Sequence, residues 1–322
     1  MHLTGKSLLI DKGNSTNFPN INNDILFQSR KVFSAVDMGA YEYRIAKRIY
    51  VDLAATGSND GTSWVDAYQD LQVALDNAGQ HDSLWVAKGV YIPKDSPQGD
   101  TINPRDRAFH ILRNINIFGG FDGGETVISD RKPRKYKVIF DGDLGGSLGK
   151  CYHVFVSTKV SRSTQLNGIT IRNGQANGTG TISFNGVTVA RNSGGAIFNS
   201  NSNLQLWDSE IIDNSGVYGA GVYNQSFSQL YIVNTLFENN ASTGLGGAIY
   251  NKNSSPSTFR SVFSSNSAVS GGAVYTTTTS TFTSNPTYVS SVFTDNSATF
   301  GGAICSDNKA TGQYTNSTFF RN

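Results

Sequence analysis

Five acidic side chains lie within 22 positions in the first half of the chain and could bind a metal ion: Asp122, Glu125, Asp130, Asp141 and Asp143. Asp141 and Asp143 flank a single glycine, and together with Asp122 they could present oxygen ligands to a calcium ion. Aspartates beside glycines also satisfy the backbone groups of turns. The cluster is therefore either a calcium site or a set of turn-stabilising side chains.

Five basic side chains overlap the acidic cluster: Arg131, Lys132, Arg134, Lys135 and Lys137. A local positive patch of this kind could bind an anionic glycan, although it could also be a solvated loop. The whole chain has a net charge of only +2, and 16% of its residues are charged. This balance provides no general attraction to nucleic acid, so a polysaccharide or a cell-surface glycan is the partner to consider.

A polysaccharide lyase or glycosidase needs carboxylates within about 5–10 Å of each other, or calcium with a basic residue that abstracts a proton. One repeated position, described below, reads Asp213, Asn239, Ser265 and Asp295 in successive repeats. Its two acids are three repeats apart, about 14 Å at the spacing of neighbouring strands. The clear repeats therefore assign no catalytic residue, and an enzyme would have to use the upstream coils between Asp122 and Asp143.

The other residues that often ligate metals or act as nucleophiles show no site pattern. His81, His110 and His153 lack metal-binding spacing, and Cys151 and Cys305 are far apart without a second cysteine nearby. We expect two buried thiols and no cofactor other than a structural calcium ion.

The elements that position these side chains follow from a repeat in the C-terminal half. A phrase similar to Gly-Gly-Ala-Ile begins at Gly194, Gly219, Gly246, Gly271 and Gly301, with spacings of 25, 27, 25 and 30 residues. Self-similarity at this period indicates a solenoid of stacked units. We expect its glycines to supply positive φ angles at a corner.

A second phrase, an apolar residue, two free positions and an asparagine, alternates with the first. Its copies are Val189–Asn192, Ile211–Asn214, Phe237–Asn240, Phe263–Asn266, Phe293–Asn296 and Phe319–Asn322. Both phrases are rich in β-forming residues, and the 3.6-residue period of a helix is missing between them. A helical solenoid is thereby excluded, and a leucine-rich repeat is excluded because its leucine spacing is missing. What remains is a parallel β-helix with at least two strands per coil.

Equivalent residues of successive coils should form columns along such a stack. An inward apolar column is predicted for Ile197, Val222, Ile249, Val274 and Ile304. A stack of rings is predicted for Phe237, Phe263, Phe293 and Phe319, and a hydrogen-bonded amide ladder for Asn199, Asn224 and Asn251.

The repeats are clear over residues 166–322 and weaken upstream. One amphipathic helix is predicted over about residues 65–78, with Ser63 and Asp66 at capping-box spacing and Gly79 at its end. It would cover the open end of the stack.

Residues 1–44 carry no copy of either phrase, and Asn322 is the last residue of a copy of the second phrase. We therefore expect flanking β-helix units of a longer chain, with the export signal outside this segment, and no apolar run long enough to span a bilayer.

Several segments resemble known proteins. The two phrases resemble the repeats of chlamydial polymorphic outer-membrane proteins and of related right-handed β-helix proteins from Bacteroidetes and environmental bacteria. The stretches 49–52, 57–64 and 67–72 are similar to the opening of such a helix, and 119–126 through 141–143 fit the same pattern. Residues 36–42 are similar to the closing phrase of an anchoring module.

The resemblance implies an all-β, pectin-lyase-like right-handed parallel β-helix with one N-terminal capping helix. Residues 1–44 would be the end of a preceding module, and residues 45–322 the next β-helix unit. Secretion or display at the outer membrane is also implied, with an adhesive role. We therefore predict a non-catalytic surface segment that acts as a stalk or adhesin and binds a glycan. The alternative is a carbohydrate-active enzyme.

Overall fold

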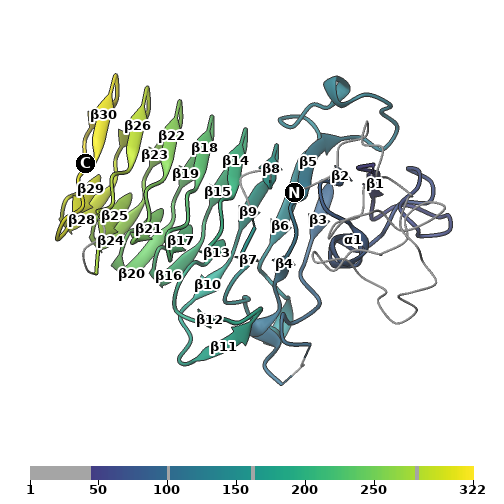
Figure 1. Cartoon of the computed structure of the whole chain (residues 1–322), viewed down its shortest axis with the longest axis horizontal. Coiled ribbons are helices and arrows are strands. Elements are labelled where there is room, and N and C mark those ends of the chain that lie inside the picture. Colours follow the sequence, from purple (N-terminus) through teal and green to yellow (C-terminus); the bar gives the residue numbers. More distant parts are fainter. Residues whose placement is uncertain (1–44, 100–101, 161–163, 280–282) are drawn as a thin grey trace, which may run out of the picture. The chain divides into compact units, whose positions relative to one another are not determined.

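The computed structural model describes residues 45–99, 102–160, 164–279 and 283–322. The predicted end of a preceding module, residues 1–44, lies outside the described residues. The chain divides into the units Met1–Lys47 and Arg48–Asn322, and the second is a parallel β-helix (Figure 1). The parallel β-helix predicted from the two phrases is thus confirmed.

The complete coils from residue 165 onward contain four short strands each, two more than the phrases required, and the two coils before them contain three. Equivalent strands of successive coils pair in parallel to form four sheets of nine, eight, seven and five strands. The nine-stranded sheet contains β1 (Arg48–Val51), β2 (Ser83–Ala87), β5 (Asn116–Phe121), β8 (Gln165–Asn167), β14 (Gln205–Trp207), β18 (Tyr231–Val233), β22 (Ser257–Phe259), β26 (Thr287–Val289) and β30 (Gln313–Thr315). The eight-stranded sheet contains β3 (Gly89–Tyr91), β6 (Val138–Asp141), β9 (Thr170–Arg172), β15 (Glu210–Ile212), β19 (Leu236–Glu238), β23 (Val262–Ser264), β27 (Val292–Thr294) and β31 (Thr318–Phe320).

The two remaining sheets complete the coil. The seven-stranded sheet contains β4 (Phe109–Ile111), β7 (Phe155–Thr158), β13 (Ile197–Ser200), β17 (Val222–Gln225), β21 (Ile249–Lys252), β25 (Val274–Thr277) and β29 (Ile304–Ser306). The five-stranded sheet contains β10 (Gln175–Ala176), β16 (Ser215–Tyr218), β20 (Ala241–Leu245), β24 (Ser267–Ser270) and β28 (Ser297–Phe300). Short 3₁₀ helices occupy Pro104–Asp106, Ile128–Asp130 and Gly146–Leu148.

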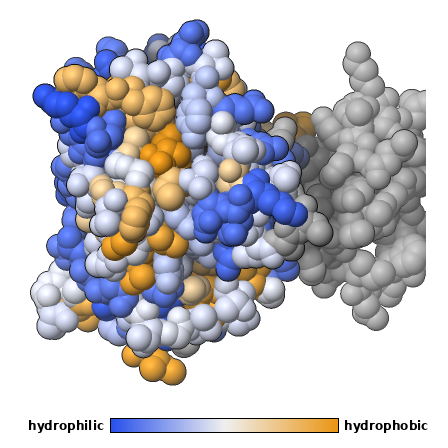
Figure 2. Space-filling view, turned by 90° about the vertical axis from the view of Figure 1, so that its left-hand side faces the viewer, coloured by the Kyte–Doolittle hydropathy of each residue, from blue (hydrophilic) through white to orange (hydrophobic). Residues whose placement is uncertain are grey.

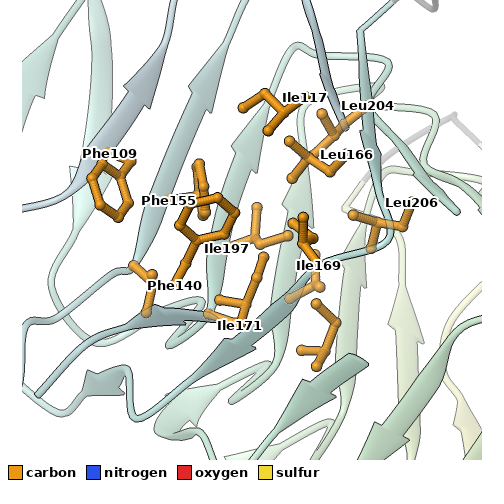
Figure 3. Close-up of a cluster of buried hydrophobic side chains, with 14 of the residues drawn as sticks. Phe109, Ile117, Phe140, Phe155, Leu166, Ile169, Ile171, Ile197, Leu204 and Leu206 are labelled. Carbon is orange, nitrogen blue, oxygen red and sulfur yellow. The ribbon is translucent and has the colours of Figure 1, made fainter. Parts of the chain in front are cut away.

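The core runs along the inside of the stack, one layer of side chains per coil (Figure 3). The predicted apolar column is confirmed: Ile197, Val222, Ile249 and Val274 are fully buried and pair in register, and Ile304 continues the column, partly buried. The predicted phenylalanine stack is also confirmed, with ring centroids 4.7–4.8 Å apart and nearly parallel planes. This spacing equals the strand spacing of a sheet, so each ring lies on the ring of the previous coil.

On the end face of the last described coil, side chains that continue the core columns are partly exposed. Figure 2 looks onto this face, where apolar side chains lie among hydrophilic ones. Phe319 is 47% exposed, whereas Phe293, one coil earlier in the same column, is fully buried.

Two asparagine ladders bind the coils together. Asn199 Nδ2 donates to Asn224 Oδ1 at 2.8 Å, and the ladder continues through Asn251 to Thr276. The asparagines of the second phrase form a longer ladder, with side-chain distances of 2.7–3.0 Å, through Asn214, Asn240, Asn266, Asn296 and Asn322. A buried amide that finds its partners within the ladder avoids the cost of an unmade hydrogen bond.

The two glycines of the first phrase have different roles, contrary to the expectation that both supply positive φ. Only the first does: φ lies between 56° and 78° at Gly194, Gly219, Gly246, Gly271 and Gly301. The second is glycine in four of the five copies and Ala220 in the other, and where it is glycine it lies against neighbouring backbones. At Gly195, a Cβ atom would lie 2.5 Å from the carbonyl oxygens of Ala220 and Ser215.

The predicted helix of residues 65–78 is shorter than expected. α1 spans Leu71–Asn77, and Asp70 caps it by accepting hydrogen bonds from the N–H groups of Gln72 and Val73. It cannot begin earlier, because the backbone of Tyr68 pairs with β1. Ser63 and Asp66 do bond each other, but they close a turn. α1 packs against β1 and β4 and adds Leu71, Ala74 and Leu75 to the core, as a cap should.

One predicted copy of the asparagine phrase, Val189–Asn192, lies outside the stack. Its valine belongs to β12 (Val187–Ala190), which pairs antiparallel with β11 (Thr181–Phe184) in a hairpin. Asn185 and Gly186 form the turn with φ angles of 50° and 67°, which is the preferred chemistry of a two-residue hairpin loop. The Asn185-Gly186 pair could have predicted this hairpin from the sequence. Asn214 bonds instead to the backbone N–H of Gly174 in the preceding coil.

Candidate functional site

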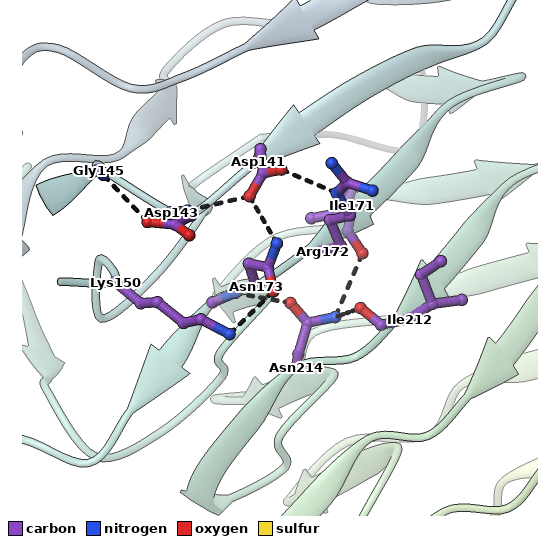
Figure 4. Close-up of polar contacts among 10 residues, drawn as sticks. Asp141, Asp143, Gly145, Lys150, Ile171, Arg172, Asn173, Ile212 and Asn214 are labelled. Carbon is purple, nitrogen blue, oxygen red and sulfur yellow. Dashed lines mark hydrogen bonds and ion pairs between the residues drawn. The ribbon is translucent and has the colours of Figure 1, made fainter.

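The predicted calcium ligands lie in two separate networks. Asp141 is buried, and its carboxylate accepts hydrogen bonds from Arg172 Nε and Asn173 Nδ2, each at 2.8 Å (Figure 4). Its Oδ1 also accepts the backbone N–H of Asp143 at 3.0 Å, so these two aspartates are neighbours in one turn. Asp143 in turn accepts the N–H of Gly145.

Asp122 belongs to the second network, where it forms an ion pair with Lys88. The hydrogen bond from Lys88 is the main reason that the pKa of Asp122 lies below its ordinary value. Beside it, the Glu125 carboxylate accepts backbone N–H groups of Asp122, Gly123 and Gly124 at 2.8–3.1 Å. The described residues contain no group of three or more acidic, histidine or cysteine side chains arranged to hold a metal ion. Calcium binding at Asp122, Asp141 and Asp143 remains a prediction.

The repeated position that contains Asp213 and Asp295 has the spacing that the sequence argument gave, with its two acids three coils apart. Asp213 and Asp295 occupy equivalent corners with two coils between them, both with positive φ. Asp295 pairs with Arg321, and Asp213 accepts a hydrogen bond from Asn239. Neither carboxylate has a second one at the same corner of the adjacent coil.

The basic segment folds back over the stack as a loop between β5 and β6 (Figure 1). Arg131 Nη1 donates to Asn167 Oδ1 at 2.6 Å, and its guanidinium lies 5.5 Å from the centre of the Phe118 ring. Pro133 packs where Gly120 and Gly168, both with positive φ, leave room: a Cβ atom on either would lie within 2.8 Å of the proline. These contacts hold the basic loop on the coils that follow it.

A groove of about 1010 Å³ lies between this loop and the outer surface of four coils. Six basic side chains and two acidic ones line it: Arg131, Lys132, Arg134, Lys135, Lys137, Arg260, Asp208 and Glu210. Lys137 forms an ion pair with Glu210, which also accepts a hydrogen bond from Thr170 Oγ1 at 2.8 Å. Burial lowers the pKa of Arg131, and the nearby Asp208 carboxylate opposes this shift. The groove therefore carries an excess of positive charge.

The sequence indicated the basic run but not the rest of the groove. Asp208, Asn234 and Arg260 lie at the corner between the nine- and eight-stranded sheets, each with φ between 47° and 49°. They occupy equivalent positions in successive coils, a relation that the phrase spacing of about 26 residues could have revealed. Only the folded loop brings the residues of positions 128–137 onto them.

From the sequence no histidine had an assigned role, and one of them, His153, is buried in the structure. His153 is 2% exposed; its Nδ1 lies 2.9 Å from the carbonyl oxygen of Gly194, and its Nε2 has no hydrogen-bond partner. The ring packs edge-on against Phe198. Burial lowers the pKa of this imidazole from 6.5 to about 4.

We expect His153 to make the fold sensitive to acid. Because the pKa is lower in the folded state, protonation below pH 6.5 favours the unfolded chain, so stability decreases as the pH falls from 6.5 to about 4. The loss between about pH 7.5 and pH 5 should be about 2 kcal/mol. Urea unfolding at both pH values should show this loss in the wild type and a smaller one in His153→Gln. An equal loss in both proteins would contradict the assignment.

The family model that matches is that of the Chlamydia polymorphic membrane protein repeat, over residues 234–252, 260–277 and 290–312. The chain carries polymorphic membrane protein repeats. Each matched segment begins at the corner that lines the groove, or at its equivalent, and runs through the asparagine and glycine phrases into the seven-stranded sheet. The resemblance inferred from the two phrases is therefore confirmed for these repeats.

The other comparisons add little about function. The solved structure of a pectin methylesterase from Aspergillus niger is similar over 86% of this chain and 87% of its own, with 13% identity and a TM-score of 0.45. The comparison with curated protein sequences finds no match. Within the described ranges, every helix is too short or too polar to cross a bilayer.

Proposed function

We propose that this chain is a non-catalytic segment of a secreted or surface-displayed β-helix protein, a stalk with an adhesive role that binds glycans in the basic groove. The repeats support the surface location, because the matching family is described as a membrane protein. The stacked coils support the stalk role, since a solenoid extends by adding coils without changing the layers already formed.

The observation that carries the binding role is the composition of the groove. Its six basic side chains exceed its two acidic ones, and both acids already accept hydrogen bonds, Asp208 from Asn234 and Glu210 from Thr170. Hydrolysis of a glycosidic bond needs one protonated and one free carboxyl group on either side of the bond. The groove favours binding of an anionic ligand over this chemistry.

A degradation assay separates the binding role from the enzymatic alternative. The protein is incubated with acidic and neutral polysaccharides, with and without calcium, and new reducing ends and unsaturated products are measured. We expect retention of polysaccharide without cleavage. Cleavage that Asp141→Asn abolishes and Asp143→Asn preserves, with both variants folded by circular dichroism, would establish the enzyme instead.

Two further measurements address the remaining parts of the proposal. Labelling of intact cells with an antibody against the repeats should detect the protein, and labelling only after lysis would contradict surface display.

Thermal unfolding with calcium or magnesium tests the predicted metal site. A higher midpoint with calcium alone, lost in Asp122→Asn, would support it, and an unchanged midpoint would not.

A further inference from the structure

The groove runs along the axis of the β-helix. Four of its lining residues, Gly168, Asp208, Asn234 and Arg260, stand at the same corner of four successive coils. At about 4.8 Å per coil, this corner extends about 14 Å. A binding surface with one equivalent position per coil suits a linear polymer better than a compact ligand.

An aromatic strip borders the groove on the outer face of the nine-stranded sheet. The strip consists of Trp207, Tyr231 and Phe259, with ring centroids 5.9 Å and 5.1 Å apart. Trp207 and Phe259 directly precede Asp208 and Arg260, which line the groove. Tyr231 is 36% exposed, and Trp207 is held in place by a 2.9 Å hydrogen bond from Nε1 to Gln205. Trp207 and Phe259 are partly buried, and such accessible rings in a row offer apolar surfaces for the faces of sugar rings.

The six cations of the groove differ in whether they already contact other side chains. Lys137 and Arg131 are engaged with Glu210 and Asn167. Among the described residues, Arg134 and Arg260 are exposed and form no ion pair or hydrogen bond through their guanidinium groups. Guanidinium groups bind carboxylate or sulfate oxygens through two parallel N–H donors, so these two arginines are available for an acidic ligand.

The acids that line the groove favour a glycan over a nucleic acid. Every backbone unit of a nucleic acid carries a phosphate that Asp208 and Glu210 would repel, whereas a polysaccharide can place neutral, hydroxyl-bearing parts of its sugars against them. Sugar hydroxyls, by contrast, donate hydrogen bonds that carboxylates accept. A polymer that carries both hydroxyl donors and acidic groups matches the mixed lining.

We propose that the groove binds a linear acidic polysaccharide that runs parallel to the β-helix axis. Its sugar rings pack against Trp207, Tyr231 and Phe259, and its carboxylate or sulfate groups bind Arg134 and Arg260. This inference rests on the proposed glycan-binding role of the same groove and specifies the class of glycan.

The test is a titration of the full chain with four probes: a polyuronate, a sulfated polysaccharide, the carboxyl-reduced neutral form of the polyuronate, and single-stranded DNA. The double variant Arg134→Gln/Arg260→Gln should weaken binding of an acidic polysaccharide by about tenfold or more, since two charge-assisted contacts are lost. Lys252→Gln/Lys309→Gln removes the same charge from residues that do not line the groove and should leave the affinity unchanged. Tyr231→Ala should weaken binding several-fold without changing its dependence on salt.

Each outcome decides between named alternatives. Binding of the polyuronate or the sulfated polymer, but not of the neutral form, supports the proposal and shows which acidic group is preferred. Equal binding of the neutral polymer, or equal affinity of the two double variants, overturns it while leaving a glycan-binding role intact. Tighter binding of DNA overturns it in favour of a nucleic acid. The polymer length after incubation is measured separately, and shortening would contradict the non-catalytic role whatever the affinities are.

Discussion

Replacing Phe263 with alanine is expected to destabilise the β-helix by about 4 kcal/mol. The ring is fully buried and lies between the rings of Phe237 and Phe293, with centroid distances of 4.8 Å and 4.7 Å. Its removal leaves a cavity in the core and interrupts the stack, because the paired strands on either side prevent the coil from collapsing. The decrease should appear as a lower midpoint of urea unfolding, followed by circular dichroism.

Phe319→Ala provides the matched control, since Phe319 occupies the same column in the last coil. It is 47% exposed and has a stacked ring on one side only, that of Phe293. Its loss should cost about 1–2 kcal/mol, because much of the ring already contacts water. Equal losses in the two variants would show that the stack does not stabilise the interior coils.

Asn240→Ala is expected to cost about 3 kcal/mol. The fully buried amide donates to the carbonyl oxygen of Ile211 at 2.8 Å and to Asn266 Oδ1 at 3.0 Å. Its Oδ1 accepts from both the backbone and the side-chain nitrogen of Asn214. Alanine removes these buried hydrogen bonds together. Asn266 Oδ1 keeps the backbone N–H of Asn240, and Asn214 Nδ2 keeps the carbonyl oxygens of Ile171 and Ile212. A buried group left with no partner costs about 1–3 kcal/mol, and each other lost hydrogen bond about 1 kcal/mol. Thermal and urea unfolding of the purified variant measure the loss.

The neighbouring residue distinguishes this effect from a general loss of an asparagine. Asn239 is exposed and has a φ of 54°, so Asn239→Gly removes an amide while keeping a residue that adopts this backbone conformation. It should change stability by no more than about 1 kcal/mol. If Asn240→Ala and Asn239→Gly lowered the free energy of unfolding equally, the asparagine ladder would contribute no stability beyond that of an exposed asparagine.

The columns of the core were predictable because a parallel stack turns sequence periodicity directly into spatial neighbours. Phe237 and Phe263 are 26 residues apart and contact each other for that reason alone. The same logic placed Asp213 and Asp295 in separate coils and removed a carboxylate pair from consideration. It failed where the chain leaves the period, as at the hairpin that contains Val189.

The helix was misjudged for a related reason. The apolar pattern of residues 65–78 is consistent with a helix, but Val65 and Asp66 form a turn, and hydrogen bonds pair the backbone of Tyr68 with β1. A propensity is local, whereas the pairing of Tyr68 with Tyr50 and Asp52 depends on where the first coil lies. Tertiary contacts prevailed over the local preference.

The period and residue types alone were sufficient to predict the parallel β-helix, its inward columns and its asparagine ladder, because each depends on identical contacts repeated once per coil. The candidate site depends on contacts that occur once. Pro133 can lie on Gly120 and Gly168, and Arg134 can line the same groove as Arg260, only when an unrepeated loop folds across four coils. No periodicity encodes that position, since the loop is held by single hydrogen bonds and close packing between residues far apart in the chain.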